Sequence, residues 1–223
     1  MRLLPSPSIL AGVATALLLA TACSQATSQA ASFEGTELDP VRAATGFQLH
    51  DQFENRLSLS DLAGKVVILT FLYTNCPDIC PVITETLKRA HTQLGDDADD
   101  VRLVAGSVDP ERDTVEQAHR YSERSGMLDR WAFLVGTEDE LTPIWSAYYI
   151  AAQRQGIEEG GGALDRLDDE ADSHTDADIA ELAYLVTHSS AAYLIDRQGR
   201  LRVLFTELSL DPEPLLHDIR LLL

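Results

Sequence analysis

The feature that most constrains the fold is an apolar segment that runs directly into a pair of cysteines. Residues 65–73, KVVILTFLY, are continuously apolar and rich in β-branched side chains, which is typical of a central strand covered on both faces. Cys76 and Cys80 follow in the stretch NCPDICP, and apolar residues then recur at helical spacing from Pro81 to Leu94. This order predicts two thiols at the amino terminus of a helix, immediately after a central strand.

The remainder of the chain alternates between strand and helix patterns. Strands are predicted at 101–108 and 131–136, helices at 113–126, 138–150 and 211–223, and hairpins at 47–62 and 190–205. The order predicts an α/β protein with a thioredoxin-like fold, in which helices flank both faces of a mixed central sheet. The hairpin at 47–62 is an addition at the amino-terminal end of that fold.

The first 45 residues have the pattern of a targeting segment and a tether. Residues 9–22 are largely apolar but too few to span a bilayer comfortably, and they end in LLATAC. We expect residues 1–22 to be a lipoprotein-type signal peptide, with Cys23 lipidated, and residues 23–45 to be a flexible linker to a domain at 46–223. Ordinary signal cleavage after Ala22 is the alternative. The expected location is the periplasmic side of a bacterial cell envelope, lipid-anchored to a membrane.

The chain is strongly acidic. Its 36 acidic and 17 basic residues give a net charge of −19, which argues against nucleic acid or anionic lipid head groups as partners. Residues 156–182 are glycine-rich and then acidic, with His174 among them. We expect this segment to be a solvated surface insertion. The alternative is a loop that collects metal ions weakly.

The cysteine pair is suited to either of two kinds of chemistry. A helix amino terminus favours thiolates, so both cysteines are expected to ionise more readily than free cysteine. Spaced at i and i+4, Cys76 and Cys80 can form a disulfide and exchange electrons, or can hold a soft ion such as Cu(I). Structural zinc usually needs four donors, and no second C-x-x-C or H-x-x-x-H pair is present.

A third copper donor would have to be a histidine. His188 lies just before the predicted hairpin at 190–205, in a loop that should face the cysteines in a thioredoxin-like fold. It is equally compatible with a loop histidine that bonds only to backbone. The other histidines outside the acidic insertion are expected at the surface: His50, His91, His119 and His217.

Three stretches together resemble the Sco/SenC family of copper-binding, thioredoxin-like proteins that help assemble cytochrome c oxidase. They are YTNCPDICP (73–81), GSVDPERDT (106–114) and HSSAAYLIDRQG (188–199), and the similarity covers about residues 40–220. The resemblance implies copper ligands at Cys76, Cys80 and His188. It also implies a copper-receiving oxidase subunit as partner, together with other periplasmic copper carriers. An aspartate commonly precedes the family's histidine, whereas Thr187 stands here.

These observations give one leading hypothesis and two alternatives. The first is a membrane-tethered periplasmic copper metallochaperone for the dinuclear copper site of cytochrome c oxidase. The second is a thiol-disulfide oxidoreductase that uses Cys76 and Cys80 as catalytic residues to keep the target's copper-ligand cysteines reduced. A peroxidase or copper-stress sensor has the least support in the sequence.

Overall fold

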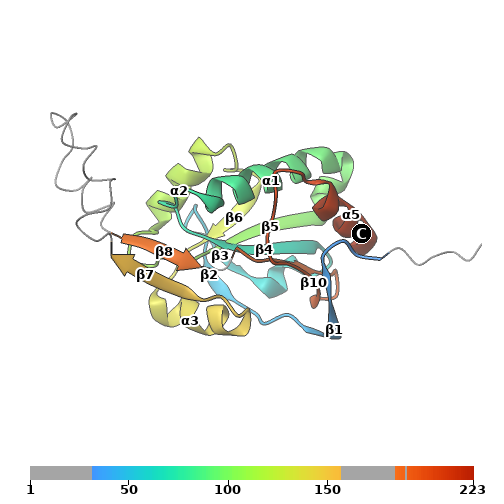
Figure 1. Ribbon diagram of the computed structural model, residues 1–223, viewed down its shortest axis with the longest axis horizontal. Helices are drawn as coiled ribbons and strands as arrows, with labels where there is room; N and C mark the ends of the chain where they lie inside the picture. The colour runs from blue at the N-terminus through green and yellow to red at the C-terminus, as the bar shows by residue number, and fades with distance from the viewer. Residues whose placement is uncertain (1–31, 157–183, 189) are drawn as a thin grey trace, which may run out of the picture. The chain divides into compact units, whose positions relative to one another are not determined.

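A six-stranded mixed sheet organises the computed structural model, which describes residues 32–156, 184–188 and 190–223 (Figure 1). The sheet order is β1-β10-β9-β4-β5-β6, where β4 pairs in parallel with β5 and antiparallel with β9. The strands are β1 (Thr36–Ala43), β4 (Val66–Leu72), β5 (Val101–Ser107), β6 (Trp131–Leu134), β9 (Ala192–Ile195) and β10 (Arg200–Phe205). The predicted mixed sheet with β4 at its centre is confirmed.

Helices cover both faces of this sheet, as predicted. They are α1 (Ile79–Leu94), α2 (Val115–Arg124), α3 (Glu138–Ala147) and α5 (Glu213–Leu222), with short 3-10 turns at Leu59–Leu62 and Gly95–Asp100. In Figure 1 α1, α2 and α5 lie above the sheet, and α3 lies below it. Thr114 caps α2 by accepting a hydrogen bond from the Gln117 backbone N–H. In the part of the chain that the structure describes, no helix is long and apolar enough to cross a bilayer.

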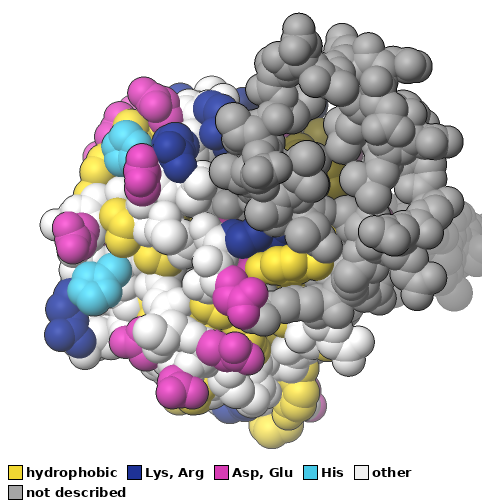
Figure 2. All heavy atoms as spheres, turned by 90° about the vertical axis from the view of Figure 1, so that its left-hand side faces the viewer, with side chains coloured by type: hydrophobic (Ala, Val, Ile, Leu, Met, Phe, Trp, Pro, Cys, Tyr) yellow, Lys and Arg dark blue, Asp and Glu magenta, His cyan; other side chains and the backbone are white. Residues whose placement is uncertain are grey.

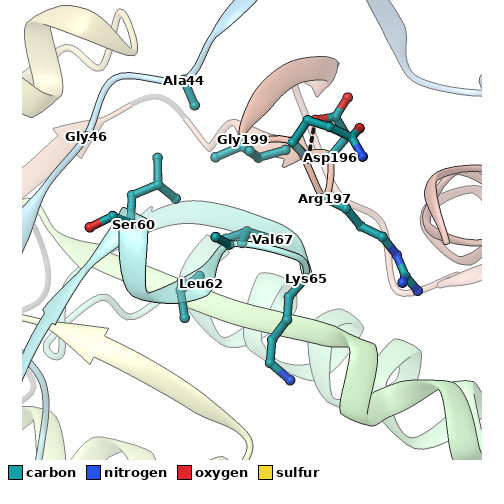
Figure 3. A pocket seen from close by; sticks show the side chains of 13 residues that line it. Ala44, Gly46, Ser60, Leu62, Lys65, Val67, Asp196, Arg197 and Gly199 are labelled. Atoms are coloured by element: carbon teal, nitrogen blue, oxygen red, sulfur yellow. Dashed lines mark hydrogen bonds between the residues drawn. The ribbon is translucent and has the colours of Figure 1, made fainter.

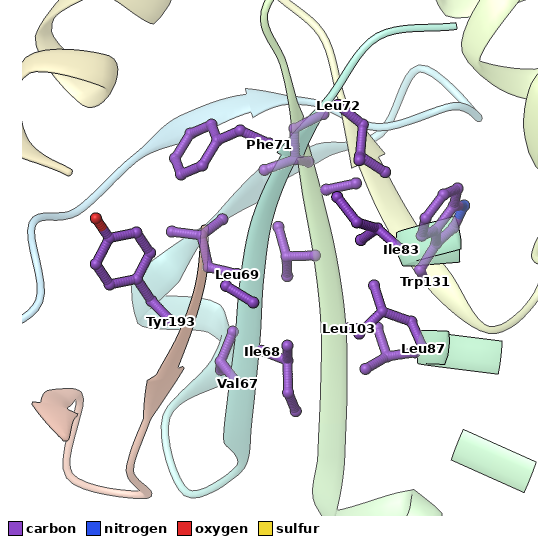
Figure 4. Close-up of a cluster of buried hydrophobic side chains, with 14 of the residues drawn as sticks. Val67, Ile68, Leu69, Phe71, Leu72, Ile83, Leu87, Leu103, Trp131 and Tyr193 are labelled. Carbon is purple, nitrogen blue, oxygen red and sulfur yellow. The ribbon is translucent and has the colours of Figure 1, made fainter. Parts of the chain in front are cut away.

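Strand β4 forms the centre of the core because all seven of its residues are buried. Successive side chains of a strand point to opposite faces. Figure 4 shows this alternation: Phe71 and Leu69 lie on the same side as Tyr193, whereas Leu72 lies with Ile83 of α1. Burial on both faces explains why the sequence of β4 is continuously apolar rather than alternating.

Two small sheets lie outside the main one. Strands β2 (Gln48–His50) and β3 (Arg56–Ser58) form the antiparallel hairpin predicted within 47–62. Strands β7 (Ala152–Gly156) and β8 (Tyr184–His188) pair antiparallel on either side of the predicted acidic insertion. The sequence did not predict this second pair, and it placed His188 in a loop rather than at the end of a strand.

The prediction that residues 23–45 form a flexible linker is wrong for residues 36–43. These residues form β1, which pairs antiparallel with β10 at the edge of the main sheet. Most side chains of β1 are exposed and Pro40 interrupts it, so the segment lacks the apolar pattern of an inner strand. A form of the protein that began at residue 46 would therefore lose an edge strand.

Several predictions concern residues outside those described. The signal peptide, Cys23 with its lipid, and residues 23–31 of the linker all lie there, as do His174 and residues 157–183 of the acidic insertion. These remain predictions.

Asp218 of α5 anchors the segment that leads into β1. Its carboxylate is fully buried and accepts hydrogen bonds from the backbone N–H groups of Glu34 (2.8 Å) and Gly35 (2.9 Å). Hydrogen bonds to a charged group contribute more than neutral ones, so Asp218→Ala is expected to lower the free energy of unfolding by about 2–4 kcal/mol. Urea unfolding measures this loss, and amide exchange should rise first in residues 34–43. Unchanged exchange in that segment would contradict the anchoring role.

Candidate metal centre

Cys76 and Cys80 come together where β4 passes into α1. Cys76 lies in the connecting loop with 9% of its surface exposed, and Cys80 lies in the first turn of α1, fully buried. The backbone N–H of Cys80 donates a hydrogen bond to the Cys76 Sγ atom at 3.4 Å. Cys76 and Cys80 are not joined by a disulfide in this structure. The sequence therefore placed the pair correctly, at the amino terminus of a helix that follows the central strand.

The expectation that both thiols ionise readily is wrong for Cys80. Burial raises the pKa of Cys80 far above its ordinary value, and hydrogen bonding to Cys76 raises it further. The helix amino terminus is present, but a fully buried thiolate loses its hydration, and this loss outweighs the helix dipole. Spacing along the sequence shows where a cysteine lies on a helix but not how much of its surface reaches water.

A buried carboxyl group holds the loop that joins β4 to α1 and carries Cys76 (residues 73–78, the cysteine loop). Asp113 accepts hydrogen bonds from the Thr74 backbone N–H (2.9 Å) and the Thr74 hydroxyl (2.6 Å) through one oxygen. Its other oxygen accepts from the Ser107 hydroxyl at 2.5 Å. This network joins the loop to the end of β5 and the start of α2. The local sequence does not reveal this network, because Asp113 and its partner Thr74 are 39 positions apart.

Asp113 gives the protein a specific pH dependence. Burial raises the pKa of Asp113 from 3.8 to about 6, although the bonds from Ser107 and Thr74 lower it in part. Between these values the folded state retains a proton that the unfolded state releases. Folding stability should therefore fall, by on the order of 2–3 kcal/mol, as pH rises from about 4 to about 6.

The variant Asp113→Asn isolates this contribution because it cannot titrate. Urea melts at pH 4, 5, 6 and 7 give the unfolding free energy of the wild type and of the variant. As pH rises from about 4 to about 6, the wild type should lose stability relative to the variant. A constant difference across the series would contradict the assignment.

Strand β8 contacts the cysteine loop through Tyr73. The Val186 backbone N–H donates a hydrogen bond to the Tyr73 hydroxyl at 3.4 Å. Burial raises the pKa of Tyr73 to about 12, and the neighbouring Cys76 adds to the increase, so this hydroxyl stays protonated. Tyr73 precedes Cys76 by three positions. This contact therefore places β8 beside the segment that leads into the cysteines.

His188 is the last residue of β8, and its backbone pairs with Ala152 of β7. Its side chain is outside the described part of the structure, so its ligand role remains a prediction. Thr187, which stands where the resembled family often has aspartate, is exposed. Among the described side chains, no group of three or more histidine, cysteine, aspartate or glutamate residues could hold a metal ion. The described cysteine pair would need a further donor to complete a three-ligand site.

The surface around this end of the molecule carries mixed charges. Figure 2 looks at the left-hand side of Figure 1, where β7 ends and β8 begins, and shows acidic, basic and histidine side chains interspersed with hydrophobic ones. A polar hollow of about 330 Å³ adjoins the cysteine loop, lined among others by Thr74, Pro81 and Tyr121. A second pocket of about 500 Å³ lies at the opposite end of β4, beside Lys65, Val67 and Gly199 (Figure 3). That second pocket is no part of the cysteine site.

The fold and the paired thiols define a thioredoxin-like protein with a C-x-x-x-C site. The SCO1/SenC family model matches residues 36–223, and the chain belongs to this family. The SCO1 protein homolog of Bacillus subtilis is 34% identical over 91 residues, which cover 40% of this chain and 47% of that relative. The match thus spans about half the length of that protein.

Solved structures show the same fold. Bradyrhizobium japonicum ScoI with copper bound has a TM-score of 0.60 and 29% identity, and the match covers 82% of this chain and all of that one. A second structure is of BsSco, described with a disulfide switch and as a member of the Sco family of cytochrome c oxidase assembly proteins. Its TM-score is 0.58 at 23% identity, over 83% of this chain and 96% of its own. The predicted thioredoxin-like fold and Sco/SenC family are both confirmed.

Proposed function

We propose that this protein is a copper metallochaperone that binds one copper ion through Cys76, Cys80 and His188. It delivers copper to, or prepares, the dinuclear copper site of a cytochrome c oxidase subunit. The observation that carries this proposal is the convergence of two thiols at the start of α1, with the Cys80 N–H 3.4 Å from Cys76 Sγ, in a member of the SCO1/SenC family. Copper is the cargo of such a protein.

The donor set suits copper better than other metals. Thiolates and imidazole are the donors that Cu(I) prefers, and two thiolates with one imidazole satisfy it. Structural zinc usually takes four donors, and the described residues hold no such group. Support for His188 as third donor comes from its position at the end of β8, two residues after Val186, which bonds to the cysteine loop.

The second candidate function is disulfide exchange. The two thiols lie close enough for the Cys80 backbone N–H to donate a hydrogen bond to the Cys76 sulfur. In this reaction the two thiols are oxidised to one disulfide, and two electrons and two protons pass to a disulfide of the target. The function needs no histidine, and this difference separates it from the chaperone function.

One transfer experiment distinguishes the two. The copper-loaded chain is mixed with the metal-free, reduced copper domain of the oxidase subunit, and copper in each protein is measured after separation. In a parallel arm the metal-free, reduced chain meets the oxidised domain, and the thiols formed are counted. For a chaperone, His188→Ala should stop copper transfer. If the wild type transferred no copper while Cys76→Ser abolished thiol formation, disulfide exchange would be the function.

The proposal also places the protein on the periplasmic side of a bacterial membrane, held by a lipid on Cys23. The support is the apolar run at 9–22 and the LLATAC sequence that ends it. Cys23→Ser should move the protein from the membrane fraction to the soluble periplasmic fraction or leave it unprocessed at its signal peptide. Mature, membrane-bound protein in the variant would contradict lipidation at this residue.

A further inference from the structure

The β7–β8 pair is a separate two-stranded sheet, so side-chain contacts must set where β8 lies relative to the cysteines. Besides the Val186 bond to Tyr73, the described hydrogen bonds of β8 with the rest of the domain go to the loop between β5 and α2. The Tyr184 hydroxyl donates to Asp109 Oδ1 at 2.6 Å, and Arg112 Nη1 donates to the Tyr184 carbonyl oxygen at 3.0 Å. Tyr184 opens the strand that His188 ends.

Arg112 is at the centre of these contacts. Its guanidinium carbon lies 3.7 Å from the centroid of the Tyr184 ring and 5.7 Å from that of the Tyr73 ring. Its Nε atom also makes an ion pair with Asp109 Oδ2. A single side chain therefore touches the β5–α2 loop, β8 and the tyrosine that leads into the cysteine loop.

The burial of Asp109 makes this arrangement cooperative. Its carboxylate is fully buried, with one oxygen paired to Arg112 and the other accepting from Tyr184. A buried carboxylate that loses a partner destabilises the fold, so the ion pair with Arg112 and the hydrogen bond from Tyr184 stabilise each other. Both contacts hold β8 packed on the rest of the domain. Lysine could supply the charge but neither the planar stacking surface nor the forked donors of arginine.

We propose that Arg112 is a positioning residue for the metal site: with Asp109 and Tyr184 it fixes β8, and through β8 the place of His188 relative to Cys76 and Cys80. This inference rests on the proposed function for its final step, the engagement of copper by His188. The first step, the fixing of β8, concerns the metal-free protein and is tested without copper.

The metal-free test uses Arg112→Lys, which keeps a positive charge beside Asp109. Amide exchange at Val186, followed by NMR, should accelerate by about tenfold or more because this N–H bonds to Tyr73 only while β8 is docked. The control is Arg120→Lys on the exposed side of α2, where the arginine pairs with Glu116 of the same helix, and it should leave Val186 unchanged. Tyr184→Phe, which removes the hydroxyl's bonds to Asp109 and Glu111 but keeps the ring beside Arg112, is a second variant that should give a smaller acceleration.

The copper test is a double-mutant cycle with anaerobic Cu(I) titration against a competing chelator. Arg112→Lys should weaken Cu(I) binding by about 10–100-fold in the wild-type background, the range typical of residues that orient metal ligands. In the His188→Ala background the same change should cost less than about threefold, because the ligand that Arg112 positions is absent. A general folding defect would cost the same in both backgrounds.

Each contrary result has a distinct meaning. Unchanged exchange at Val186, or equal losses of copper affinity in both backgrounds, overturns the positioning role while His188 can remain a ligand. If His188→Ala does not weaken copper binding, the proposed ligand set fails and the positioning claim fails with it. The wild-type and His188→Ala titrations show which failure has occurred.

Discussion

Replacing Cys80 by serine is expected to weaken Cu(I) binding by about a thousandfold, well beyond the 10–100-fold typical of losing a residue that only supports a ligand. Serine supplies a hard oxygen donor in place of a soft thiolate, and Cu(I) prefers sulfur. Cys76→Ser should give a loss of similar size, because the two thiols lie side by side at the start of α1. Anaerobic titration of the reduced protein against a competing Cu(I) chelator measures both.

A control is needed because Cys80 is fully buried and its hydroxyl replacement could disturb packing. Thermal unfolding of the metal-free variants should show folded proteins, and the Cys76→Ser variant, at the edge of the buried region, should be nearly as stable as wild type. A copper affinity within tenfold of wild type in either folded variant would contradict a two-thiolate site.

Phe71→Ala should produce one of the largest losses of stability that the structure leads us to expect from a single core substitution. Phe71 is fully buried on β4, and its ring centroid lies 5.8 Å from that of Tyr148. Truncation of such a side chain removes apolar burial and leaves a cavity, which typically costs about 3–5 kcal/mol. Urea unfolding of the reduced, metal-free protein is the measurement, and a loss below about 1 kcal/mol would contradict the packing described.

Gly106 provides a matched test of the same contact. It is the register partner of Phe71 on β5, and a Cβ atom added there would lie 3.2 Å from two carbons of the Phe71 ring. Gly106→Ala should therefore cost about 1–3 kcal/mol by overpacking. Combined with Phe71→Leu, the alanine should cost clearly less than it does alone, which a double-mutant cycle would show.

The sequence predicted the centre of the fold because burial there has a simple pattern. A strand buried on both faces has a continuously apolar sequence, and the seven buried residues of β4 show this pattern. Helix α1 and the β9–β10 hairpin followed from helical spacing and from a turn with glycine. Strand β1 could not be recognised in the same way, because edge pairing uses backbone groups and leaves its side chains exposed.

The candidate site was predictable only in part, and for related reasons. The two cysteines are close together in the sequence, between an apolar strand pattern and a helical one. Their position at a strand-to-helix junction could therefore be predicted. The raised pKa of Cys80 depends on burial by distant segments, which spacing does not reveal. The contact of Arg112 with Tyr184 joins residues 72 positions apart across the acidic insertion. No local pattern specifies such a pair.

The central claim is that two cysteines and His188 bind one copper ion, and X-ray absorption spectroscopy of the Cu(I)-loaded protein tests it most directly. The account predicts two sulfur neighbours and one imidazole nitrogen in the wild type, at one copper per chain. In His188→Ala the imidazole signal should vanish while both sulfur neighbours remain. An imidazole signal that persists in His188→Ala, or a wild-type spectrum with sulfur neighbours and no imidazole, would contradict the three-ligand site.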